Sequence, residues 1–311
     1  MKKMISLISL LLILSAGMVF ANGAQDETSN DQITIGVTYQ NMQNEFILSI
    51  QDGLRAKAEE LGVKVIEQDG QGSAEKQISQ VENFIIQEVD AIVLNPFDKD
   101  GCAPALDKAV AAGIPVIVVN AMVSNIEKAN AYVGSEDVVA GEMEAQYIAD
   151  LLGGKGNVAI IHGPNGHSAE IQRTIGNKNV LGKYPDIKIL AEQTANWSRI
   201  EALNLVENWL TSGMELNAIL GQNDEMALGA YKAIEAAGKQ NDIFVIGIDA
   251  IPDALQSVED GKLVATVFQD ARGQGAGAVE LAYKVANGES IPDLLNIPFI
   301  LVTKENLAEF K

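Results

Sequence analysis

Nine side chains suited to binding a small polar molecule lie close behind apolar runs of this 311-residue chain. A hydroxyl group both donates and accepts hydrogen bonds, and Asn and Gln amides do the same from one planar group. An Asp carboxylate accepts from neighbouring hydroxyls, an Arg guanidinium donates a fork of N–H groups, and aromatic rings cover the C–H faces of a sugar ring. We therefore predict a site for an uncharged, hydroxyl-rich ligand. The candidates are Asn44, Phe46, Asn120, His167, Arg173, Trp197, Asn223, Asp249 and Gln269.

The elements that position these side chains follow from the apolar pattern. Short runs rich in Val, Ile and Leu alternate with amphipathic stretches of about a dozen residues, a usual helix length. Because the short runs are continuously apolar, we predict parallel strands covered by helices on both faces. Two successive series of such units predict an α/β fold of two similar, Rossmann-like lobes. The predicted strands are 33–37, 63–66, 91–94, 115–119, 158–161, 187–190, 218–220, 244–248 and 263–268, with a last apolar run at 297–302.

The predicted helices separate these strands, and the turns between them carry the candidates. Asn223 lies between the strand 218–220 and a helix, where Asp224 favours the helix N-terminus. In open parallel sheets, ligands bind at the carboxyl ends of the strands. We therefore expect the candidates to meet in one cleft. The predicted helices are 46–61, 106–112, 138–152, 168–183, 199–211, 225–237 and 272–287, with a further helix capped by Ser73.

Taken singly, each candidate also has a purely structural explanation. An Asn at a strand end is commonly a turn or cap residue. Trp197 is typical of a partly buried core position, and Arg173 of a surface ion pair. His167 is typical of a capping or solvated position. The prediction of a binding site depends on the whole set.

The N-terminus has the pattern of a secretory signal peptide. Lys2 and Lys3 precede a mostly apolar run that ends at Ala21. A transmembrane anchor is the alternative, but the run 5–20 is shorter than the roughly 20 residues of a spanning helix. We therefore expect export with cleavage near Ala21; the family resemblance described below implies that the destination is the periplasm.

Composition limits the classes of partner. The formal charge is −20, and it falls to −22 when Lys2 and Lys3 are removed with the leader. This acidity argues against nucleic acid and anionic membranes as partners. Cys102 is the only cysteine, so it forms no internal disulfide. The remaining length is enough for about two domains.

Four stretches make the chain resemble the periplasmic sugar-binding proteins of ABC importers, of the ribose and glucose/galactose type. They are NEFILSIQDG (44–53), QNDEMALGA (222–230), VIGIDAIPD (245–253) and DGKLVAT (260–266). The resemblance implies two lobes, 22–134 plus 270–298 and 135–269 plus 299–311, joined by three crossings. It implies a monomeric receptor that closes on a monosaccharide and delivers it to an ABC permease in the inner membrane. The implied ligand contacts are Asn44, Phe46, Asn120, Arg173, Trp197, Asn223, Asp249 and Gln269.

Departures from the family pattern bear on the ligand. Ribose binders carry Asp-Arg where this chain has Asn120 and Ala121, and a second Phe where it has Ile47. His167 followed by Arg173 is similar to the glucose/galactose pattern.

Two acids of that glucose/galactose pattern are replaced, by Ala169 and Asn44. The departures favour a pyranose or a cyclic polyol such as inositol over ribose. The calcium loop of some glucose/galactose receptors has no clear counterpart, so we expect no metal.

Three other classes of protein are alternatives to a sugar receptor of an ABC importer. Residues 273–278 read G-x-G-x-x-A, the dinucleotide fingerprint, but they lie inside a predicted helix with no βαβ unit after them. With two histidines and one cysteine, no catalytic cluster stands out, so we expect neither enzyme nor cofactor. A sugar-responsive repressor would carry a helix-turn-helix where this chain has its leader. A receptor that feeds a chemoreceptor or sensor kinase stays open as an alternative.

Overall fold

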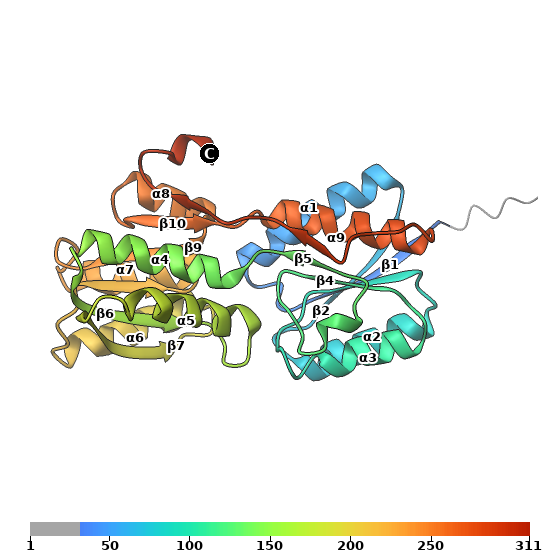
Figure 1. The fold of residues 1–311 in the computed structure, drawn as a ribbon, viewed down its shortest axis with the longest axis horizontal. Coiled ribbons are helices and arrows are strands. Elements are labelled where there is room, and N and C mark those ends of the chain that lie inside the picture. Colours follow the sequence, from blue (N-terminus) through green and yellow to red (C-terminus); the bar gives the residue numbers. More distant parts are fainter. Residues whose placement is uncertain (1–31) are drawn as a thin grey trace, which may run out of the picture. The chain divides into compact units, whose positions relative to one another are not determined.

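The computed structural model describes residues 32–311. They form two lobes, each built on a six-stranded sheet with helices on both faces (Figure 1). The predicted α/β class with parallel sheets is confirmed. The predicted signal peptide, residues 1–21, lies outside the described residues. Within 32–311, no helix is both long and apolar enough to cross a membrane.

The sheet of the first lobe is parallel throughout. Its residues alternate between two cores, as the two-residue period of a strand requires. Ala91 and Val93 face one core, and Ile92 and Leu94 face the other. In spatial order the strands are β11 (Leu294–Asn296), β5 (Ala131–Gly134), β4 (Val116–Val119), β3 (Ala91–Leu94), β1 (Thr34–Tyr39) and β2 (Lys64–Asp69).

Two pairs of helices cover this sheet, one pair on each core. One pair is α1 (Glu45–Leu61) with α9 (Ala271–Ala286), and the other is α2 (Ala74–Ile86) with α3 (Ala103–Ala111). A short 3₁₀ turn, η1 (Ile126–Lys128), follows β4. The glycine-rich run 273–278 lies within α9, as predicted. A Cβ on Gly275 would stand 2.0 Å from the Ile50 carbonyl oxygen, so glycine is what lets α9 approach α1.

The second lobe repeats the plan, with one antiparallel strand at an edge. In spatial order its strands are β12 (Ile300–Val302), β10 (Ala265–Phe268), β9 (Phe244–Asp249), β8 (Ala218–Gly221), β6 (Lys155–His162) and β7 (Asp186–Thr194). Its helices are α4 (Asp137–Leu151), α5 (Ser168–Leu181), α6 (Arg199–Thr211), α7 (Asp224–Ala236) and α8 (Pro252–Glu259), with η2 (Leu307–Glu309) at the end.

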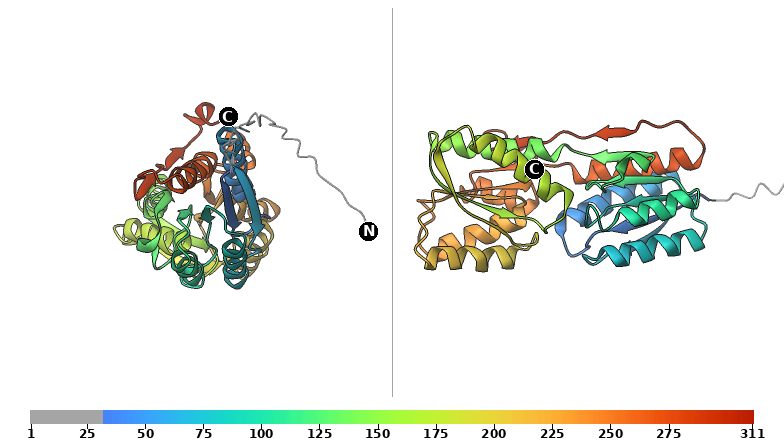
Figure 2. Two further views of the ribbon diagram at one scale, coloured as in Figure 1. Left: turned by 90° about the vertical axis from the view of Figure 1, so that its right-hand side faces the viewer. Right: turned by 60° about the horizontal axis from the view of Figure 1, so that its bottom comes forward.

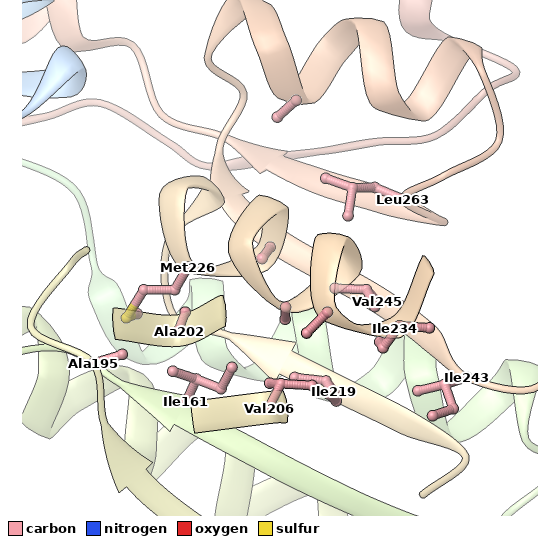
Figure 3. Packing of buried hydrophobic residues seen from close by; sticks show 14 of the residues in the cluster. Ile161, Ala195, Ala202, Val206, Ile219, Met226, Ile234, Ile243, Val245 and Leu263 are labelled. Carbon is pink, nitrogen blue, oxygen red and sulfur yellow. The ribbon is translucent and has the colours of Figure 1, made fainter. Parts of the chain in front are cut away.

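The largest core of this lobe lies between its sheet and α6 and α7. Figure 3 shows Ile161, Ile219 and Val245 of the strands packed against Val206 of α6 and Ile234 of α7. All five of these residues are 0% exposed. Burial on this scale fixes the strand ends at which the candidates lie.

The chain passes between the two sheets three times: between β5 and α4, between β10 and α9, and between β11 and β12. The views of Figures 1 and 2 place these crossings along one side of the described structure. The third is bonded to the first, because the Ile297 N–H donates to the Gly134 carbonyl at 2.8 Å.

Three elements were missing from the prediction: β5, β11 and α8. β11 has only three residues, two of them exposed, so it lacks a clear apolar period. β5 is a buried run of four residues, no shorter than β3, and was overlooked. α8 has eight residues and begins at Pro252. The predicted run 297–302 is strand only from Ile300, because its first part forms the third crossing.

Candidate functional site

The carboxyl ends of strands from both sheets meet at one cavity with about 310 Å³ of space between its atoms. All nine predicted residues line it, from both lobes. Three further lining residues were not among the nine: Gln40, Ile47 and Ala169.

Three of the predicted residues cap a helix while lining the cavity. The Asn44 side chain accepts from the Phe46 N–H at 2.9 Å, and the Asn223 side chain accepts from the Met226 N–H at 2.9 Å. Both bonds use Oδ1, because a backbone N–H only donates. Each amide therefore keeps its Nδ2 donors for other partners. Asn44 and Asn223 therefore cap a helix, as their residue type suggested, and also line the cavity.

His167 is the third cap, and it also bonds across the cleft. Its Nδ1 accepts from the Ala169 N–H at 3.2 Å, so the ring proton is on Nε2, which donates to Gln40 Oε1 at 2.9 Å. Burial, assisted by the charge of Arg173, lowers the pKa of His167 to about 3. The ring is therefore a neutral donor at neutral pH, and it joins the second lobe to the first.

Arg173 is buried at the centre of the second lobe's side of the cavity, at 4% exposed. Its Nε donates to Asp137 Oδ1 at 2.8 Å, and its Nη1 to the Gln222 carbonyl at 2.6 Å. Its Nη2 donates to Gln269 Oε1 at 3.1 Å. It is not the surface ion pair that its residue type suggested. The three bonds hold the guanidinium plane in one orientation beside the cavity.

Asp249 is the one carboxylate in the cavity lining. Burial raises its pKa well above the ordinary value, and the neighbouring Arg173 opposes that shift. Within residues 32–311, its side chain has no protein hydrogen bond, although it is only 7% exposed. A buried carboxyl of this kind needs a donor, and a ligand hydroxyl supplies one.

The backbone at Asp249 is strained, and hydrogen bonds to Asp224 stabilise it. Asp249 and Ala250 have φ values of 128° and 57°, a region that costs non-glycine residues free energy. Asp224 accepts from the Ile251 N–H at 3.0 Å and from Thr266 Oγ1 at 2.7 Å. These bonds hold the turn that directs Asp249 into the cavity.

Gln269 presents an unused donor. Its Oε1 accepts from Arg173, whereas its Nε2 is buried without a partner among the described residues. Buried donors in native proteins are nearly always satisfied. An acceptor on a bound molecule in the cavity would satisfy this one.

Trp197 forms an aromatic wall. A Cβ on Gly163 would stand 2.0 Å from Cζ2 of Trp197, so the ring lies directly on that glycine. The ring meets His167 edge-on at 5.4 Å, and the Arg173 guanidinium lies 5.8 Å from its centroid. Its φ is 60°, and that of Asn196 is 54°. The strained turn between β7 and α6 therefore serves to place this ring.

The cavity adjoins an outer hollow of about 790 Å³ at the mouth of the cleft. The two share Gln40, Asn44 and Trp197. The outer walls include Phe97, Arg199 and the exposed Ile200.

Sequence reasoning missed Gln40, although a signal for it was present. Gln40 follows β1 directly, so the strand-end argument applied to it as much as to Asn44. Asn95, directly after β3, was missed for the same reason. It is fully buried and accepts from the Gln40 N–H at 3.2 Å. Ile47 and Ala169 were noted only as departures from a family pattern.

Comparison with known proteins agrees with this geometry. Residues 35–290 match the model of the periplasmic binding protein domain. A putative rhizopine-binding protein of Rhizobium meliloti is 40% identical over 89% of this chain and 92% of its own length. The ribose import binding protein of Bacillus subtilis is 36% identical over 98% of this chain and all of its own length.

A solved structure has the same fold. It is an ABC transporter solute-binding protein from Bacillus halodurans C-125 with bound myo-inositol, 42% identical, with a TM-score of 0.87 over 90% of this chain and 97% of its own. The predicted resemblance is confirmed, and the dinucleotide enzyme is set aside. The chain belongs to the periplasmic binding protein family and, within it, to the sugar- and polyol-binding solute receptors of ABC importers, which are not enzymes.

Proposed function

We propose that this receptor captures an uncharged six-membered ring bearing several hydroxyls, either a pyranose sugar or a cyclic polyol such as inositol. One observation carries the proposal: the cavity holds buried hydrogen-bonding groups without protein partners. Gln269 Nε2 is a buried donor without an acceptor among the described residues, and Asp249, at 7% exposed, is a carboxyl that no described protein group donates to. A hydroxyl group satisfies either kind.

The rest of the lining supports the same ligand class. The capping bonds of Asn44 and Asn223 leave their Nδ2 groups as donors toward the cavity. The charge of Arg173 is balanced by its hydrogen-bonded partner Asp137, which favours a neutral ligand. Phe46 and Trp197 supply apolar rings for the C–H faces of the ligand.

The identity of one lining residue, Ile47, and of Ala121 next to the lining residue Asn120 argues against ribose. Where ribose binders carry an Arg and a second Phe, this chain has Ala121 and Ile47. The myo-inositol bound to the Bacillus halodurans receptor makes a cyclic polyol the second candidate beside a pyranose. Both present a ring of hydroxyls to the same nine side chains.

We place the lobe boundaries at the three crossings, giving 22–134 plus 270–298 and 135–269 plus 299–311. The sheet membership of β11 and β12 supports this division. Ligand closes the lobes, and the closed surface docks on an ABC permease. The mature protein is a periplasmic monomer, released by cleavage near Ala21. A chemoreceptor or sensor kinase is a second possible recipient of the closed form.

A thermal-shift screen of the mature protein tests the ligand class. The panel is glucose, galactose, xylose, ribose, myo-inositol and scyllo-inositol at millimolar concentration. A micromolar Kd stabilises the fold by about 4 kcal/mol under these conditions, which raises the melting temperature by several degrees. We expect a shift with a pyranose or an inositol and a smaller one with ribose. A shift with ribose alone, or with no member of the panel, overturns the proposal.

Small-angle scattering tests the closing motion. We expect the radius of gyration to fall when the ligand from the screen is added at saturation. An unchanged radius with demonstrated binding contradicts the clamp.

A further inference from the structure

A chain of buried hydrogen bonds runs from the cavity residue Asn120 to the first crossing between the lobes. Asn120 Nδ2 donates to Gln274 Oε1 at 3.1 Å, and Gln274 Nε2 donates to Ser135 Oγ at 3.2 Å. Gln274 is 0% and Ser135 2% exposed. Neither lines the cavity. Gln274 lies in the first turn of α9, directly after the second crossing, and Ser135 lies on the first.

Backbone groups at the other end of this series of hydrogen bonds determine which atom of each amide donates and which accepts. Asn95 Oδ1 accepts from the Gln40 N–H at 3.2 Å, and Asn95 Nδ2 donates to the Val119 carbonyl at 3.1 Å. A backbone N–H only donates and a carbonyl only accepts, so the Asn95 amide has one possible orientation. Its Nδ2 then faces Asn120 Oδ1, at the longer distance of 3.5 Å. Asn120 must in turn direct Nδ2 at Gln274, which directs its own Nε2 at Ser135.

The same crossing is also bonded to the other side of the cavity. Asp137, two residues after Ser135, accepts from Arg173 Nε at 2.8 Å. Asn120 on one lobe and Arg173 on the other are therefore both tied to the segment 135–137. The segment 135–137 thus contacts cavity residues of both lobes at the first crossing.

We propose that Gln274 and Ser135 are positioning residues for the ligand site. Asn95 sets the direction of the Asn120 amide, and Gln274 and Ser135 hold it in that orientation from the other side, so that a fixed set of its atoms meets a ligand hydroxyl. Gln274 and Ser135 also join that amide to the crossings. The inference rests on the proposed function, because it assigns the orientation of a group within the same cavity.

Affinity for two epimers separates positioning from simple stability. The probes are myo-inositol and scyllo-inositol, which differ in one hydroxyl configuration. We expect Gln274→Met to weaken the tighter of the two about 10-fold, the equivalent of one hydrogen bond, and to bring the ratio of their Kd values toward one. We expect Ser135→Ala to weaken binding in the same way. Ser135→Thr keeps the hydroxyl, so its Kd values should stay within about 2-fold of the parental ones.

Asn177→Leu is the matched control. Asn177 is an equally buried amide, bonded to the Gly141 carbonyl and to Glu144 rather than to the cavity. We expect it to lower the melting temperature while leaving both Kd values unchanged. The proposal is overturned if Gln274→Met and Ser135→Ala keep the parental Kd values and their ratio. It is also overturned if Asn177→Leu loses as much affinity as they do.

A second measurement needs no ligand. In the unliganded protein, we expect one side-chain amide proton of Asn120, identified by its loss in Asn120→Asp, to exchange slowly with solvent. Gln274→Met and Ser135→Ala should accelerate that exchange. If no sugar or inositol binds the parent, the proposed function fails, and this exchange still decides the hydrogen-bonded chain. Equal exchange rates of this Asn120 amide proton in the parent and both variants would refute the proposed series of hydrogen bonds.

Discussion

Arg173 and Asp137 form a buried ion pair, with Nε 2.8 Å from Oδ1 and side chains 5% and 3% exposed. The pair joins α5 to the start of α4, immediately after the first crossing. Removing one partner of a buried pair leaves an uncompensated charge, which costs far more than losing a surface pair. The pair is therefore a structural requirement of the cavity wall.

Asp137→Ala is expected to reduce the free energy of unfolding by about 3–5 kcal/mol, because it leaves the Arg173 charge buried. Urea unfolding measures this change. The control is Asp52→Ala, which breaks an exposed pair to Arg272 at 3.0 Å and is expected to cost at most about 1 kcal/mol. Similar losses in both variants would show that burial does not matter here.

Asp249→Asn is expected to weaken ligand binding by about 10- to 150-fold. The hydroxyls of a bound ligand would stabilise the ionised carboxylate, so the variant removes a charged acceptor, and hydrogen bonds to charged groups contribute about 1.5–3 kcal/mol each. The unliganded variant is expected to be no less stable than the parent at pH 7, because burial disfavours the Asp249 carboxylate. Calorimetric titration and unfolding of the same sample check both statements. Parental affinity would remove Asp249 from the site.

Glu144→Gln is expected to flatten the dependence of stability on pH. Glu144 is fully buried in α4, and burial raises its pKa from 4.5 to about 8, against the opposing effect of a bond from Asn177. The folded state therefore binds the proton more tightly than the unfolded state. Its stabilisation is complete below pH 4.5 and is lost as pH rises to about 8, at up to about 1.4 kcal/mol per pH unit.

Urea unfolding at several pH values between 4.5 and 8 measures this slope. Glutamine cannot titrate, so the variant gains stability over the parent as pH rises. Glu136→Gln, at an exposed position just before the same helix, is the control and should keep the parental slope. Equal slopes in parent and Glu144→Gln would place the titration elsewhere.

Gly53→Ala is expected to destabilise the first lobe by about 1–3 kcal/mol, because a methyl group there overpacks the contact between α1 and α9. The added Cβ would stand 2.1 Å from the Arg272 carbonyl oxygen. Thermal unfolding measures the loss. Glu59→Ala, on the exposed side of α1, is the comparison and should change stability little. A gain in stability at Gly53 would contradict the close approach of the two helices.

The sequence predicted the layers and the cavity lining because both follow from local pattern. Continuous apolar runs such as 116–119 become parallel strands, and residues just beyond them, such as Asn120, must then lie at one edge. Whether the nine lining residues bind ligand stays a prediction.

Features set by tertiary contacts were not predictable in this way. The bond between Asn120 and Gln274 joins residues 154 positions apart. The pairing of Arg173 with Asp137 depends on how α4 packs against α5. β11 is a strand only because it pairs with β5 at the sheet edge.

Asn44 and Asn223 each cap a helix and line the cavity, and this combination has an evolutionary consequence. Helix capping accepts Asn, Asp, Ser and Thr with similar stability, yet these residues show a ligand very different chemistry. Replacing such an asparagine by aspartate keeps the helix start and exchanges a hydrogen-bond donor for an acceptor. A lineage can thus change the molecule it recognises by single substitutions that leave the scaffold's foldability almost untouched.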